Sequence, residues 1–153
     1  MHAVSGVILI DLEAYKELVR AVELAELYVT EFRSSRQADI EFPLRFSTAL
    51  RLDEPVFAPR ALIVEPVFQL SAGKDDVQAA DATSALVEIK IVWRVVYSFG
   101  DKDPRDFDEA LVHEFVRRNV PLNVWPYARA AVTAATAQMG LPPLVIETYK
   151  VLG

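Results

Sequence analysis

His113 and Glu114 are the residues whose types and spacing come closest to a catalytic motif. They open the segment His113-Glu114-Phe115-Val116-Arg117, but a zinc-protease helix carries a second histidine four residues after the first, where this chain has arginine. We therefore expect no metal at His113. Cysteine is absent from the chain, which excludes disulfides, thiolate nucleophiles and zinc–thiolate sites.

Acidic pairs offer the other conceivable chemistry, general acid and base catalysis. Asp75 adjoins Asp76, and Asp101 precedes Asp103 by two residues. Both pairs stand in segments with Gly or Pro, where acidic residues usually serve turns and solubility. No glycine-rich phosphate loop or nucleophile elbow accompanies them. The sequence thus predicts a protein that is not an enzyme and uses no cofactor.

Length and composition limit the remaining classes. The 153 residues are 52% hydrophobic and 25% charged, and no Gly/Ser-rich linker interrupts them, so we expect a single domain over residues 1–153 that shares apolar surface with partners. The sequence contains no run of about 18 or more apolar residues, so it predicts no membrane-spanning helix. A net charge of -6 argues against tight nonspecific binding to nucleic acid.

The first ten residues are apolar but lack the basic start of a secretion signal. The segment Met1–Ile10 also reaches Asp11 before an apolar core of sufficient length forms. Together with the absence of cysteine, this predicts a cytoplasmic location.

Two elements are expected near the N-terminus. From Asp11 to about Ala25, apolar residues recur every three or four positions, which predicts an amphipathic helix capped by Asp11. A strand is expected to follow across Leu24 to Arg33, where apolar side chains stand on both faces. The cluster Arg33-Ser34-Ser35-Arg36 is interpreted as a solvated strand end or turn.

Three further segments alternate apolar and polar residues with period two. They cover Asp39 to Leu52, Ala61 to Ser71 and Ser84 to Phe99, and the third is unusually long for a strand. Pro43 and Pro66 indicate an edge position or a bulge. The connections over 53–60 and 73–83 are short, which predicts antiparallel neighbours in a meander.

Helices are expected to close the chain. Asp106 and Glu109 form a possible capping box for a helix through about Arg118, which Pro121 would end. Another helix is predicted from Pro126 to Gly140. The fold class is therefore α+β, a four-stranded antiparallel meander sheet with helices on one face, preceded by an N-terminal helix.

Two motifs near the C-terminus resemble SecB-family chaperones. These are Trp125-Pro126-Tyr127-Ala128-Arg129 and the following Gly140-Leu141-Pro142-Pro143-Leu144. The resemblance implies a four-stranded antiparallel sheet followed by a helix, assembly as a dimer of dimers, and an ATP-independent holdase that binds unfolded or partly folded proteins. The helix before the first strand is similar to the SecB-like branch, some of whose members protect an antitoxin.

Partners remain open between two alternatives within that resemblance, protein export and protection of an antitoxin. Export-type members bind the SecA motor through acidic residues near the sheet and a polar C-terminal tail. Here the corresponding features are Arg33-Ser34-Ser35-Arg36 and Val151-Leu152-Gly153, which do not favour a SecA link and leave SecA binding open. The rival hypotheses are a small apolar-ligand-binding or thioesterase-like domain and a purely structural oligomer subunit.

Candidate site residues follow from the same reasoning. Apolar residues expected to contact clients or another subunit are Phe42, Phe46, Trp93, Leu122, Trp125, Tyr127, Val132, Met139, Leu141 and Leu144. The family motif comprises Trp125, Pro126, Tyr127, Arg129, Pro142 and Pro143. Trp125 and Tyr127 are expected to anchor the core or a subunit interface rather than a client. Arg129 is expected to form an ion pair or to cap carbonyls.

Overall fold

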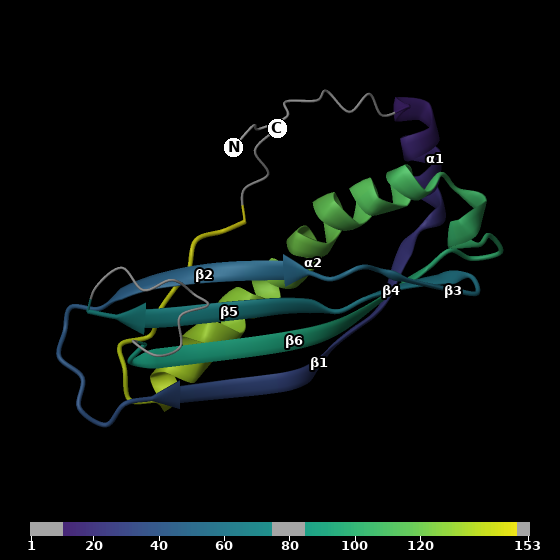
Figure 1. The fold of residues 1–153 in the computed structure, drawn as a ribbon. Coiled ribbons are helices and arrows are strands. Elements are labelled where there is room, and N and C mark those ends of the chain that lie inside the picture. The colour runs from purple at the N-terminus through teal and green to yellow at the C-terminus, as the bar shows by residue number, and fades with distance from the viewer. Residues whose placement is uncertain (1–10, 75–84, 150–153) are drawn as a thin grey trace.

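An antiparallel sheet is crossed on one face by a long helix in the computed structural model, which describes residues 11–74 and 85–149 (Figure 1). The interpretations of Met1–Ile10, Asp75 and Asp76 concern residues outside those described. The elements are α1 (Leu12–Ala21), β1 (Glu23–Arg36), β2 (Arg45–Leu52), β3 (Val56–Ala58), β4 (Ala61–Val64), β5 (Pro66–Gly73), β6 (Val87–Ser98), the 3-10 helix η1 (Pro104–Asp106) and α2 (Glu109–Gln138).

Helix α1 begins at the predicted cap. The Asp11 carboxylate accepts hydrogen bonds from the backbone N–H groups of Glu13 and Ala14, at 3.1 and 3.2 Å. The helix ends at Ala21 rather than near residue 25, because β1 starts at Glu23 and pairs with β6. Leu18 is fully buried and attaches α1 to the core.

Strand β6 lies in the middle of the sheet. It pairs antiparallel with β1 on one side and with β4 and β5 on the other. Its odd-numbered residues are buried and its even-numbered residues half-buried, which confirms the period-two prediction. The meander prediction holds for β2, β5 and β6, but β1 pairs with β6 instead of β2. Residues 37–44 carry the chain between the two edges of the sheet.

Two predicted strands are shorter than expected. The segment predicted from Asp39 becomes a strand only at Arg45, after the cis peptide bond between Phe42 and Pro43. The segment over 61–71 divides at Glu65 into β4 and β5, because Pro66 cannot donate a ladder hydrogen bond. The hairpin of β3 and β4 replaces the predicted plain connection over 53–60.

Helix α2 is continuous, so the prediction of two helices separated at Pro121 was wrong. Buried side chains recur at every fourth residue through both prolines: Val112, Val116, Val120, Val124, Ala128, Val132 and Thr136. A proline inside a helix costs about 3 kcal/mol, whereas burying one valine contributes about 1.5 to 3 kcal/mol. Burial along this ridge therefore outweighs the cost of Pro121 and Pro126.

The ends of α2 are set by short-range hydrogen bonds. Asp108 caps the start through Ala110 N–H, whereas Asp106 forms its capping box with Asp103 in η1 rather than with Glu109. At the other end Gly140 adopts φ 73°, and Leu141 N–H donates to the Thr136 carbonyl at 3.0 Å. Gly140 thus ends the helix as predicted. Neither described helix is long and apolar enough to cross a bilayer.

Aromatic side chains fill the layer between α2 and the sheet. Trp93 and Phe68 meet edge to face with ring centroids 6.5 Å apart, and Tyr97 meets Phe115 in the same way at 5.1 Å. The Tyr97 hydroxyl donates to Asn123 Oδ1 at 2.7 Å, and burial raises the pKa of Tyr97. The core therefore depends on large rings in fixed positions.

Replacing a ring in this layer should be far more costly than replacing one at the surface. Trp93 is 1% exposed and Tyr127 is 56% exposed. We expect Trp93→Ala to lower the free energy of unfolding by about 3 to 5 kcal/mol, and Tyr127→Ala by less than about 0.5 kcal/mol. Urea unfolding followed by circular dichroism measures both. Equal losses would contradict the assignment of Trp93 to the core.

Candidate functional site

An open apolar cavity of about 210 Å³ lies between the sheet and two segments outside it. Its floor is formed by Leu70, Ala72 and Val87. One wall comes from the chain around Phe42, Leu44 and Phe46, and the other from Leu141, Pro142, Pro143 and Leu144, with Thr136 of α2 between wall and floor. We call this cavity the apolar pocket, and its two sides the residue 37–46 wall and the residue 141–149 wall.

A neighbouring hollow of about 310 Å³ continues the apolar pocket along β2. Phe46 belongs to both, and the hollow is further lined by Ser47, Thr48, Trp125, Ile146, Glu147, Thr148 and Tyr149. We call the two together the groove. Phe42 is 56% exposed and Phe46 is 45% exposed, so the groove presents aromatic rings to solvent.

Side chains of α2 hold the residue 141–149 wall by its backbone. Trp125 Nε1 donates to the Glu147 carbonyl at 2.6 Å, and Arg129 Nε donates to the Ile146 carbonyl at 2.9 Å. Both backbone groups of Leu144 are bound. Its carbonyl accepts from the Thr133 hydroxyl at 2.8 Å, and its N–H donates to the Thr136 hydroxyl at 2.9 Å. These helix residues follow one another at steps of four, four and three, so they lie along one side of α2.

This contact explains why the two C-terminal motifs occur together. Arg129 caps a carbonyl, as predicted. Trp125 packs edge to face on Phe68, with centroids 5.6 Å apart, while its N–H binds the wall. Trp125 and Arg129 therefore position the residue 141–149 wall of the groove.

Several predicted site residues meet in the groove. The apolar pocket brings together Phe42, Phe46, Leu141, Pro142, Pro143 and Leu144, and Trp125 lines the adjoining hollow. Met139 is the C-cap of α2 and packs half-buried against the core. Pro126, Leu122 and Tyr127 are exposed on α2 and do not line the groove.

Two predicted site residues are core residues instead. Trp93 is 1% exposed and Val132, a residue of α2, is fully buried, so neither side chain can contact another molecule. The prediction failed for them because an apolar stripe in a sequence does not reveal which of its residues will be covered. Conversely, Leu44 and Thr136 line the pocket and were missed. Leu44 belongs to the alternating pattern over 39–52 and could have been included, whereas no sequence signal distinguishes Thr136.

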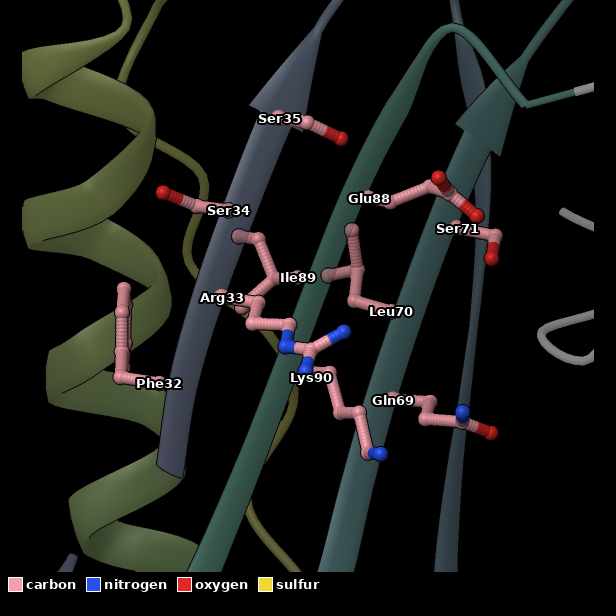
Figure 2. A pocket seen from close by; sticks show the side chains of 10 residues that line it. All are labelled: Phe32, Arg33, Ser34, Ser35, Gln69, Leu70, Ser71, Glu88, Ile89 and Lys90. Atoms are coloured by element: carbon pink, nitrogen blue, oxygen red, sulfur yellow. The ribbon is translucent and has the colours of Figure 1, made fainter. Parts of the chain in front are cut away.

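A larger, polar hollow of about 700 Å³ lies on the sheet face turned away from α2 (Figure 2). Figure 2 shows Arg33, Lys90 and Gln69 projecting from neighbouring strands on that face. Its cations already have partners, because Glu31 lies 2.7 Å from Arg33 Nε and 3.8 Å from Lys90 Nζ. We therefore regard it as a solvated sheet face and the groove as the candidate site.

The groove is lined mainly by apolar and neutral polar side chains, with Glu147 as the carboxylate among them. The residues with shifted pKa values, Tyr97, Asp103, His113, Glu114 and Arg117, do not line it. Within residues 11–74 and 85–149, no cluster of three or more His, Cys, Asp or Glu side chains could hold a metal ion. The arrangement of the groove suits apolar contact with another molecule.

Comparisons with known proteins address the fold. No family model and no curated protein matches the sequence. Among solved structures, the chain is similar to the Mycobacterium tuberculosis SecB-like chaperone Rv1957, determined in complex with a ChAD peptide from the antitoxin HigA1 (Rv1956). The TM-score is 0.70 over 91% of this chain and 98% of that one, at 15% identity. This chain has a SecB-like fold.

A second solved structure is more distant. It is a Streptococcus agalactiae protein of unknown function, with a TM-score of 0.39 and 12% identity over 82% of this chain and 96% of that one. The SecB-like fold confirms the α+β class and the N-terminal helix that the sequence predicted.

His113 lies at the start of α2 and binds Glu54 in the loop before β3. Its Nδ1 faces the Glu109 carbonyl at 2.8 Å and its Nε2 faces Glu54 at 3.0 Å, while Phe57 packs beside the ring. Each ring nitrogen thus faces an acceptor oxygen, and the protonated ring can donate a hydrogen bond to both oxygens. The hydrogen bond to Glu54 is the largest cause, and that to the Glu109 carbonyl the next, of a pKa of His113 raised above its ordinary 6.5.

This geometry predicts a pH dependence of stability. A raised folded-state pKa stabilises the fold fully below the unfolded value and loses that effect as pH rises through the folded value. We expect the free energy of unfolding to fall from about pH 6 to pH 8 more in the wild type than in His113→Gln. Because Glu54 is 88% exposed, the difference should stay below about 1 kcal/mol. Urea titrations at both pH values measure it, and parallel profiles would contradict the assignment.

Proposed function

We propose that this protein is an ATP-independent holdase chaperone that binds unfolded polypeptide segments in the groove and performs no catalysis. The observation that carries the proposal is the apolar pocket, with Phe42 and Phe46 exposed at its opening. Burial of apolar area is worth about 25 cal/mol per Å² and is non-directional. Such a surface can therefore accept many sequences.

The edge of the sheet at β2 adds a second means of binding. Among the described elements β2 pairs only with β5, so the backbone N–H and C=O groups of residues 48–52 that point away from β5 have no strand partner. An extended client could form main-chain hydrogen bonds there while its apolar side chains enter the groove. This combination favours extended, unfolded chains over folded surfaces.

We propose an antitoxin as the client in preference to an exported protein. The structure of the Mycobacterium tuberculosis chaperone contains a peptide from an antitoxin, which supports a polypeptide client of that kind. A thioesterase-like or small-ligand role is less well supported, because the groove is open along its side rather than an enclosed cavity. The pocket also lacks polar groups converging on a ligand.

Client binding should depend on Phe42 and not on exposed apolar residues elsewhere. Phe42 and Val56 are 56% and 58% exposed, but Val56 lies on β3 and does not line the groove. We expect wild-type protein at near-stoichiometric ratio to suppress light scattering by a denatured, aggregation-prone protein. Phe42→Ser should need at least about threefold more chaperone, the equivalent of one lost aromatic contact, and Val56→Ser should match the wild type. Failure of the wild type to suppress scattering would refute the holdase proposal.

Self-association is the other part of the proposal, through the edge of β1 that faces away from β6, where no described strand pairs with it. Leu24, Val29 and Phe32 are 45 to 48% exposed and share the sheet face that carries α2. Two copies of β1 paired antiparallel about the centre of the strand would bring Leu27 opposite Phe32 and Glu26 opposite Arg33. Leu27 would then meet the apolar ring of Phe32, and the carboxylate of Glu26 would meet the guanidinium of Arg33.

A charge exchange tests this pairing. Arg33→Glu would place like charges opposite each other twice in a symmetric dimer and should raise the dissociation constant about tenfold. Adding Glu26→Arg restores opposite charges and should restore the dimer. Sedimentation velocity over a range of concentrations measures both. A wild-type chain that stays monomeric at micromolar concentration, or a double variant that remains as weak as the single one, would refute the pairing.

A further inference from the structure

Arg36 is the last residue of β1 and binds three backbone carbonyls at once. Its Nε donates to Gln37 at 2.8 Å, its Nη2 donates to Ala38 at 2.9 Å and its Nη1 donates to Met139 at 2.9 Å. The guanidinium is planar and offers donors in a fixed fork, so three acceptors around it are held in defined relative positions.

Two of the three carbonyls belong to the residue 37–46 wall of the apolar pocket, and the third lies just before the residue 141–149 wall. Gln37 and Ala38 begin the residue 37–46 wall, which continues to Phe42 and Leu44. Met139 is the C-cap of α2 and directly precedes the turn at Gly140 into the residue 141–149 wall. One side chain therefore joins two segments that are about a hundred residues apart, since the Arg36–Met139 separation is 103.

Arg36 is also fixed to the floor of the pocket. Its Cα pairs with that of Val87 in the β1–β6 ladder, and Val87 lines the pocket. Gln37 N–H donates to the Leu86 carbonyl at 2.8 Å, which holds the start of the wall against the residue that precedes β6. The guanidinium thus stands at one end of the pocket, where floor and both walls meet.

We propose that Arg36 is a positioning residue that fixes the separation of the two walls and thereby selects the size of the client side chain that the apolar pocket accepts. This inference rests on the proposed holdase function. Arg36 need not touch the client, because its effect passes through the wall backbones. A pocket held at its bound width binds without first having to order its walls.

Loss of the guanidinium should leave the fold intact but the pocket loose. The residue 141–149 wall keeps its hydrogen bonds to α2, and β1 keeps its pairing with β6. The walls can then separate at the end that Arg36 held. A looser pocket binds a small side chain less well but admits a large one more readily. Lysine offers a single compact donor group that cannot span three carbonyls, so Arg36→Lys should be intermediate.

Distances between the walls provide a test that needs no client. The chain contains no cysteine, so spin labels can be attached at Glu41→Cys and Val145→Cys, which are exposed in the two walls and do not line the apolar pocket. Pulsed electron paramagnetic resonance should give a broader distribution of the distance between the two labels in Arg36→Met than in the protein with Arg36. The control is Arg51→Met, because Arg51 is exposed on β2 and pairs with Asp53 at 3.2 Å. An unchanged distribution in Arg36→Met would overturn the proposal.

Peptide binding tests the consequence for selectivity. The probes are fluorescent Ser/Gly/Lys host peptides that carry either two leucines or two tryptophans. We expect Arg36→Met to raise the dissociation constant of the leucine peptide about tenfold and that of the tryptophan peptide much less. Arg36→Lys should give intermediate values, and Arg51→Met should bind both peptides as the wild type does. Equal weakening of both peptides would overturn size selection. Thermal unfolding confirms that each variant folds, and Arg36→Lys provides the comparison if Arg36→Met does not.

The two measurements separate the inference from the function beneath it. If the wild type binds neither peptide and suppresses no aggregation, the holdase proposal fails, while the label distances still decide whether Arg36 holds the walls. If the wild type binds both peptides and Arg36→Met changes neither distance nor affinity, the function stands and the role of Arg36 is refuted.

Discussion

The structure depends on one contact. The odd-numbered face of β6 is buried against the row of α2 side chains that recur at every fourth residue. Trp93, Val95 and Tyr97 lie on one side of this interface and Val120, Val124 and Val132 on the other, all at most 2% exposed. The apolar area buried there offsets the cost of the two prolines inside α2, which remains continuous from Glu109 to Gln138. It also determines the direction of α2 across the sheet, and with it the place where the residue 141–149 wall begins.

Polar groups have a different task from that of the core. Trp125, Arg129, Thr133 and Thr136 each use a side-chain group to bind the backbone of a segment that has no secondary structure of its own. Such a segment could not satisfy its peptide groups inside a sheet or helix, so side chains of the neighbouring helix satisfy them instead. Arg36 does the same for the carbonyls at the opposite corner of the pocket.

Local patterns predicted the elements better than their connections. Strict alternation located β6, Asp11 located the start of α1 and Gly140 located the end of α2, because each signal acts within a few residues. The pairing of β1 with β6 and the continuity of α2 through Pro121 depend on tertiary burial, which local propensity does not contain. The same division holds for the site, since apolar segments were recognised but Trp93 could not be distinguished from Phe46 until the covering helix was known.

The outer strands β1 and β2 lie on opposite sides of β6 (Figure 1). The groove lies along β2, whereas the exposed apolar stripe lies on β1. A second copy added at β1 would extend the sheet away from the groove, so neither opening would be obstructed. Two client openings would then stand at the far margins of one continuous surface, and a long unfolded chain could engage both at a small additional entropic cost.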